Sequence, residues 1–176
     1  MSRDWTAPRP FLTLMQLIHH WVQVQRQLEK SYLTVSSASV DTLWQTIMNL
    51  ADVSWHPLLT STNAPQGLMP KPGLIYRAFT RLCPIPVKIF VERVQPHELI
   101  SVRVLPMPGL EEQVTYHLKS TMRGTQISYS VTLRGWLSPL AWSLLRPYAA
   151  RVAAALAEAA EQPASLEGPD SRFQVW

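Results

Sequence analysis

The sequence predicts an α+β domain in which antiparallel strands are followed by one long C-terminal helix. Short connections that contain proline or glycine separate several strand-like segments. Apolar and polar residues alternate in the last of these segments, and a long alanine-rich segment follows them. Strands joined by short turns pair with their chain neighbours, so we expect a curved, seven-stranded antiparallel sheet across residues 31–162.

The first strand and a short helix open this domain. Residues Ser31–Ser37 alternate and are rich in β-formers, which predicts a strand. Ser39 then caps a short helix that ends near Asn49. Its apolar face contains Leu43, Trp44, Ile47 and Met48. Asp52 is expected to begin a second short helical segment, which Pro57 ends.

Six further strands are predicted before the long helix. Their expected ranges are Leu58–Ala64, Leu74–Leu82, Val87–Val94, Glu98–Leu105, Glu111–Ser120 and Thr125–Gly135. In the last two, Val114, Tyr116 and Tyr129 share an apolar face, whereas His117 and Arg134 fall on the opposite face. One face of the sheet is therefore expected to be buried and the other to meet water.

The long helix is predicted from a cap at Ser138 to about Glu161, and the tail at 163–176 is expected to be flexible. Pro147 lies inside this helix and should kink it. An apolar stripe recurs every four residues and should face the sheet. It contains Leu140, Leu144, Tyr148, Val152 and Leu156.

A single helix cannot fill the concave side of a twisted sheet of this size, which predicts an apolar cavity between them. The alanines of the helix would leave further space there, although alanine is also simply the best helix former. The candidate ligand-binding residues are Trp55, His56, Tyr76, Val102, Val104, Tyr116, Tyr129, Leu144, Tyr148 and Val152.

Several of these candidates keep a second interpretation. His56 is either a polar contact or acid/base group in the cavity or a surface or capping histidine. The three tyrosines are either ligand contacts or packed core residues. Because Arg77 alternates with Tyr76, only one of the two side chains points inward, and Arg103 is expected to point outward.

Five short segments resemble the START-type helix-grip superfamily (SRPBCC), and most closely its polyketide cyclase/dehydrase-like branch. They are Val40–Trp44, Trp55–Pro57, Gly73, Val94–Leu99 and Arg123–Ile127, in the order and spacing of that branch. The resemblance implies a helix-grip fold, in which the sheet wraps around the C-terminal helix. It also implies a cavity for a lipid, isoprenoid, polyketide or similar apolar molecule, and no shared catalytic set.

Composition and motifs narrow the partners, compartment and chemistry that we expect for this protein. The net charge is +4 and the basic residues are dispersed, so we expect no nucleic-acid partner. The single cysteine, Cys83, excludes an internal disulfide and fits the cytoplasm. No apolar segment is long enough to span a membrane. No metal-ligand spacing, cofactor motif or catalytic motif stands out, and we assign no catalytic residue.

Residues 10–29 are predicted to form an additional amphipathic helix outside this domain. The helix would pack on the domain, dock on a partner protein or lie on a membrane surface. Its polar face is rich in glutamine rather than lysine, which favours packing or docking over membrane contact.

The leading functional hypothesis is non-catalytic binding or carriage of a hydrophobic or amphipathic small molecule. One alternative is a cyclase- or dehydratase-type enzyme that uses tyrosine or histidine in the cavity. Another is a scaffold or assembly factor that docks through residues 10–29.

Overall fold

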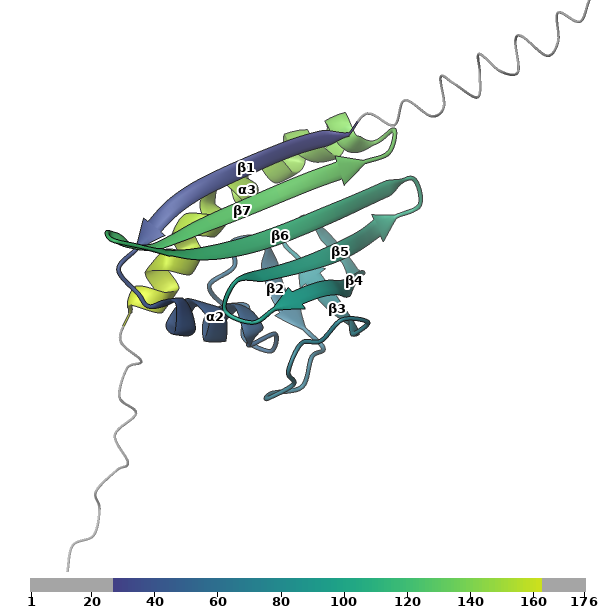
Figure 1. Ribbon diagram of the computed structural model, residues 1–176. Coiled ribbons are helices and arrows are strands. Elements are labelled where there is room, and N and C mark those ends of the chain that lie inside the picture. Colours follow the sequence, from purple (N-terminus) through teal and green to yellow (C-terminus); the bar gives the residue numbers. More distant parts are fainter. Residues whose placement is uncertain (1–26, 163–176) are drawn as a thin grey trace, which may run out of the picture.

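The computed structural model describes residues 27–162, which form a curved sheet with a long helix along one face (Figure 1). The elements, in chain order, are β1 (Leu28–Ser36), α2 (Val40–Met48), β2 (Leu59–Thr62), β3 (Ile75–Thr80), β4 (Cys83–Gln95), β5 (Leu99–Met107), β6 (Leu110–Thr121), β7 (Gly124–Arg134) and α3 (Ser138–Glu161). The strands make one seven-stranded sheet in the order β1-β7-β6-β5-β4-β3-β2. All pairings are antiparallel, so the predicted fold class is confirmed.

Alternation along β6 and β7 defines the buried face of the sheet. The two strands pair without interruption from Glu111, opposite Arg134, to Thr121, opposite Gly124. Every second residue of β7 is buried, and the same holds for most of β6. Tyr116 lies directly opposite Tyr129 on this face. Because side chains of a strand alternate between its two faces, the apolar residues that alternate in the sequence all point into the core.

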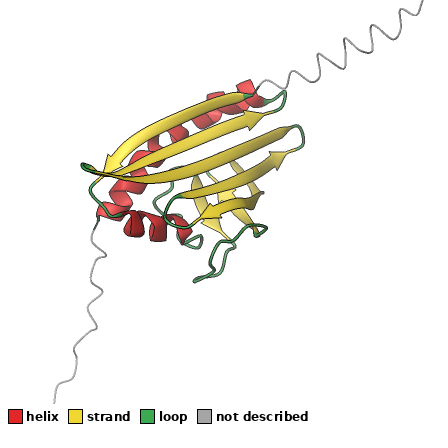
Figure 2. Cartoon of the chain, in the orientation of Figure 1, coloured by secondary structure: helices red, strands yellow, loops and turns green. Residues whose placement is uncertain are grey.

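Helix α3 packs against β1 and β7 at one end of the sheet order, and α2 packs beside it (Figures 1 and 2). The side-chain oxygen of Ser39 accepts a hydrogen bond from the Thr42 amide at 3.1 Å, as expected for a helix cap. The buried face of α2 is made by the four predicted residues, Leu43, Trp44, Ile47 and Met48. The inner faces of β3, β4 and β5 lie away from the tightest α3 contacts.

Strand β4 begins earlier than predicted and includes Pro84 and Pro86. Its pairing with β5 begins only at Lys88, opposite Leu105. The prolines therefore lie where β4 has no partner on the β5 side, and their missing N–H groups remove no hydrogen bond there.

A close contact between two glycines fixes the start of α3 over the β5–β6 turn. Gly135 has a φ of 119°, and a Cβ at this position would lie 2.1 Å from the carbonyl oxygen of Gly109. Ser138 is the first residue of α3 rather than its cap, and its hydroxyl donates to the Gly135 carbonyl at 2.8 Å. The first turn of α3 is thereby held close to the β5–β6 turn.

Two predicted helical segments need correction. The expected helical turn at Asp52 does not form, because Asp52 Oδ1 accepts from the Ser54 amide at 3.0 Å and stabilises a turn instead. Strand β1 begins at Leu28, so the predicted helix at 10–29 cannot extend to its expected end. The rest of that helix, residues 10–26, and the predicted flexible tail at 163–176 lie outside the described residues.

Candidate functional site

A cavity of about 470 Å³ lies between the sheet and the first half of α3. Its floor is formed by inward-facing side chains of β3, β4, β5 and β6, which include Val87, Ile89, Val102 and Val104. The segment between α2 and β2 forms another part of the wall. Most of the lining side chains are aliphatic or aromatic, so the cavity presents an apolar surface.

Only the first half of α3 lines this cavity. The contributing residues are Leu140, Ala141, Leu144 and Leu145, together with Leu137 directly before the helix. Tyr148 and Val152, which were predicted to bind the ligand, do not line it. Val152 is 1% exposed and packs in the core, where the second half of α3 lies tightly on its neighbours. Of the three helix residues predicted to bind the ligand, only Leu144 lines the cavity.

One end of the cavity, the mouth, is surrounded by exposed apolar side chains. These are Leu82 and Ile85 near the β3–β4 turn, Met107 at the end of β5, and Leu140 and Leu144 on α3. Ile85, for example, is 66% exposed. An apolar molecule would meet an apolar surface before it enters the cavity.

The opposite, inner end of the cavity holds a cluster of aromatic side chains. The ring of Tyr116 contacts Trp55 edge to face at a centroid distance of 6.3 Å and lies 5.1 Å from the ring of Tyr129. All three residues line the cavity. The indole Nε1 of Trp55 is buried and has no hydrogen-bond partner within residues 27–162. A buried donor without a partner is uncommon and points to a partner from solvent or ligand.

His56 lies beside this cluster, with its ring 5.2 Å from that of Trp55. Its Nδ1 accepts hydrogen bonds from the amides of Leu58 and Leu59, each at 3.2 Å. Burial lowers the pKa of His56 from 6.5 to about 4, so the ring is neutral near pH 7. Because Nδ1 accepts, the ring proton sits on Nε2. His56 therefore both stabilises the turn before β2 and lines the cavity.

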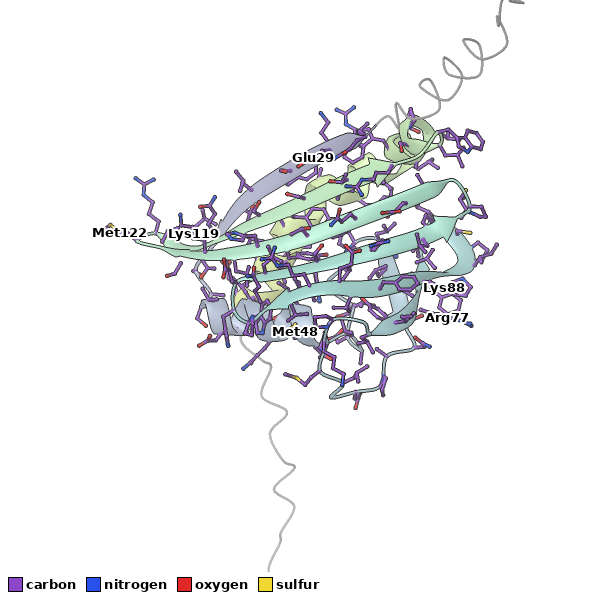
Figure 3. All side chains as sticks on the ribbon, turned by 45° about the vertical axis from the view of Figure 1, so that its right-hand side comes forward. Glu29, Met48, Arg77, Lys88, Lys119 and Met122 are labelled. Carbon is purple, nitrogen blue, oxygen red and sulfur yellow. The ribbon has the colours of Figure 1, made fainter. Side chains whose placement is uncertain are left out.

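The alternation of β3 settles which of Tyr76 and Arg77 faces inward. Tyr76 is buried and lines the cavity, and its burial raises the pKa of the phenol to about 12. Arg77 lies in register with Lys88 of β4, and both side chains are exposed (Figure 3). Arg103 also points outward, as expected, and its guanidinium pairs with Glu92.

Glu112 is a cavity residue that the sequence interpretation missed. It lies on β6, is 8% exposed and lines the cavity among apolar side chains. Burial alone raises its pKa from 4.5 to about 7, without a contribution from any hydrogen bond or neighbouring charge. Alternation could have identified it, since Glu112 has the same parity as Val114 and Tyr116.

Glu112 lies within electrostatic reach of the aromatic cluster. Burial is the main cause that raises the pKa values of Tyr116 and Tyr129, and the charge of Glu112 contributes in both cases. Glu112 lies between the mouth and the inner end, since it follows Leu110 by two residues and precedes Tyr116 by four. Polar groups from the sheet and from the segment between α2 and β2 are thus distributed through a mainly apolar cavity.

Comparisons with known proteins identify the fold. No model of a known protein family matches the sequence, and no curated protein matches it. Among solved structures, the Zhui aromatase/cyclase from Streptomyces sp. R1128 is similar with a TM-score of 0.62 at 12% identity, over 77% of this chain and 94% of that one. The di-domain aromatase/cyclase BexL of the BE-7585A biosynthetic pathway has a TM-score of 0.63 at 16% identity, over 91% of this chain and 57% of that one.

A third similar structure is Ara h 8.0201, with a TM-score of 0.59 at 12% identity, over 76% of this chain and 97% of that one. This chain has the helix-grip fold. The expected resemblance to the START-type helix-grip superfamily is thereby confirmed at the level of the fold.

The chemistry of this helix-grip cavity is defined as much by charge as by shape. Among the described residues, no lysine or arginine lines the cavity. The same part of the chain holds no group of three or more histidine, cysteine or acidic residues able to bind a metal ion. None of its helices combines the length and hydropathy that a membrane crossing needs. The site therefore offers apolar surface, aromatic hydroxyls and one buried carboxyl group.

Proposed function

We propose that this protein binds an apolar or amphipathic small molecule in the cavity between the sheet and the first half of α3, without transforming it. The observation that carries the proposal is the cavity itself, which measures about 470 Å³ and is lined mainly by aliphatic and aromatic side chains. Ligand pockets in proteins typically measure about 300–1,000 Å³ and have such linings. The exposed apolar side chains at the mouth give such a molecule a route into the cavity.

The test uses N-phenyl-1-naphthylamine, an uncharged apolar fluorophore that brightens when water is excluded. We expect saturable binding to the wild-type protein. Ala141→Phe places a ring in the cavity and should weaken binding at least tenfold, because Ala141 lines the space from α3. Ala154→Phe is the matched control, since Ala154 is exposed on the same helix and does not line the cavity. Equal binding by all three proteins would overturn the proposal.

A second candidate function is catalysis of a proton transfer in a ligand of the same kind. The observation that favours it is the carboxyl of Glu112, whose pKa of about 7 suits a general acid or base near neutral pH. Two of the similar structures are named aromatase/cyclases, which supports the same reading. Decane-2,4-dione in deuterated water tests it by NMR. Catalysis predicts that its central protons exchange faster with wild-type protein than with Glu112→Gln, and equal rates would exclude this role for Glu112.

A further inference from the structure

The Trp55 indole and the Glu112 carboxyl are two polar groups that line the cavity. The indole Nε1 of Trp55 is buried without an acceptor among the described residues. The carboxyl of Glu112 lines the cavity, and neither a hydrogen bond nor a charge contributes to its pKa. Burying a polar group without a partner costs roughly 1–3 kcal/mol, so the Trp55 indole calls for a partner inside the cavity, and the Glu112 carboxyl lines the same space.

The surroundings of Glu112 determine which form of its carboxyl is stable. On the sheet it lies between Val104 of β5 and Leu133 of β7, and the α3 residues that line the cavity are all apolar. The titratable groups that share the cavity are His56 and Asp52 before β2, Tyr76 on β3, Cys83 on β4, Tyr116 on β6 and Tyr129 on β7. None of them is a cation near neutral pH, since His56 has a pKa of about 4.

The protonated form of Glu112 is therefore the form that fits its site. Burial alone raises the pKa of this carboxyl to about 7, so a large fraction carries a proton at neutral pH. A protonated carboxyl has one O–H donor, and the indole of Trp55 is a donor only. Both groups need an oxygen acceptor, and within residues 27–162 no basic side chain lines the cavity to hold an anionic one.

We propose that Glu112 anchors the ligand by donating a hydrogen bond from its protonated carboxyl to an uncharged oxygen, such as a carbonyl, ether or hydroxyl oxygen. This inference rests on the proposed binding function and specifies its ligand class. The ligand is then a neutral, oxygen-bearing apolar molecule, and carboxylates and phosphates are excluded from the cavity. Trp55 offers a second donor toward the inner end.

The anchor makes binding dependent on pH. Ionisation of Glu112 removes its only donor and places a negative charge beside the ligand oxygen, so affinity falls above a pH of about 7. Each pH unit well above the pKa reduces the protonated fraction about tenfold. We expect the affinity for a neutral ketone to fall roughly tenfold between pH 6 and pH 8.

The experiment compares three single-chain probes with alkyl tails of similar length and different head groups: decan-2-one, decanoate and decyltrimethylammonium. Each is titrated against bound N-phenyl-1-naphthylamine at pH 6 and at pH 8. The proteins are wild type, Glu112→Gln, Glu112→Leu and the control Glu111→Gln. Glu111 is the neighbouring residue on the opposite face of β6, where it lies near Arg103 and Arg134.

For the wild type and for Glu111→Gln, we expect the ketone to bind best and to lose about tenfold in affinity at pH 8. Glu112→Gln keeps an N–H donor at both pH values, so it should bind the ketone with no dependence on pH. Glu112→Leu has no donor and should bind the ketone several-fold more weakly than wild type does at pH 6. Saturable fluorophore binding by each variant shows that its cavity still forms, and ketone affinities are corrected for any change in fluorophore affinity.

Three results would overturn the inference. Ketone binding by the wild type that does not change with pH would remove Glu112 as the anchor. Decanoate binding as tight as ketone binding would show that the cavity accepts anions. Ammonium binding at pH 6 as tight as ketone binding would show that the cavity prefers no neutral oxygen-bearing molecule. If neither the fluorophore nor any probe binds the wild type, the proposed function itself fails and this inference falls with it.

Discussion

The two halves of α3 belong to one continuous helix but meet the sheet in different ways. In the second half, Ala149, Val152, Ala153, Leu156 and Ala157 are all buried. In the first half the apolar side chains cover the cavity, and Leu140 and Leu144 are 63% and 54% exposed. One half is packed core, and the other covers the cavity.

This difference shows that the small side chains of α3 allow close packing here and do not leave a cavity. Alanines are concentrated in the buried half of α3, because short side chains allow packed elements to approach closely. The larger leucines occupy the half over the cavity. The sequence argument that alanine leaves room for a ligand therefore selected the wrong half of the helix.

The largest expected effect separates the two halves by a matched truncation. Leu156→Ala removes a side chain that is fully buried, and we expect it to lower the free energy of unfolding by about 4 kcal/mol. Leu144→Ala changes a half-exposed side chain beside an existing cavity and should cost less than about 1 kcal/mol. Urea denaturation measures both. Similar losses in the two variants would show that α3 packs uniformly.

A second effect comes from the buried titratable groups of the cavity. Glu112 has a pKa of about 7 when folded and 4.5 as an unperturbed carboxyl, so the folded state holds its proton more tightly. Its contribution is present below pH 4.5 and is lost as pH rises to about 7. His56 acts in the opposite sense, because its depressed pKa of about 4 favours folding above pH 6.5 and disfavours it toward pH 4.

Between about pH 4.5 and 6.5, ionisation of Glu112 makes stability fall with pH and titration of His56 makes it rise. The two effects on wild-type stability therefore nearly cancel there. Glu112→Gln removes the Glu112 contribution to this pH dependence of stability. We expect its free energy of unfolding to gain about 2–3 kcal/mol relative to wild type between pH 4 and pH 8. Urea denaturation across this range measures the change, and parallel pH profiles for the two proteins would contradict it.

The alternation of apolar residues and the positions of turn and cap residues explain why most of the fold was predictable. Gly124 and Gly135 bound β7, and α3 begins within one residue of the start that a cap at Ser138 predicts. The exception at Asp52 arose because its carboxylate accepts from the Ser54 amide, a local bond that competes with helix. Such competition leaves no mark in hydrophobic periodicity.

The site was only partly predictable, and the reason is physical. Strand parity places Val102 and Tyr116 on the inner face, where the structure has them, but it left open which of Tyr76 and Arg77 points inward. Parity applied equally to Glu112 would have placed a carboxyl there, against the general rule that acids stay exposed. Which half of α3 stands over the cavity depends on how the helix lies on the sheet, and its four-residue stripe is the same in both halves.

The smallest effect tests how the packed half of α3 is held at its end. Ser36 is 1% exposed, and its hydroxyl donates to Glu161 Oε1 at 2.8 Å and accepts from the Ala38 amide at 3.1 Å. Ser36→Ala removes both bonds and should lower the free energy of unfolding by about 1 kcal/mol. Ser143→Ala is the control in the cavity half, where an exposed hydroxyl bonds only the Leu140 carbonyl and its loss should have almost no effect.

The pH dependence of this last effect identifies its origin. The bond from Ser36 is the main cause that lowers the pKa of Glu161, so the bond is strongest when that carboxylate is ionised. The stability that it contributes is present at neutral pH and is lost as pH falls through the folded-state pKa of Glu161. We therefore expect the difference between wild type and Ser36→Ala to shrink in acid. A difference that stays constant would instead show that it comes from packing, because the packing of a buried hydroxyl does not depend on the charge of Glu161.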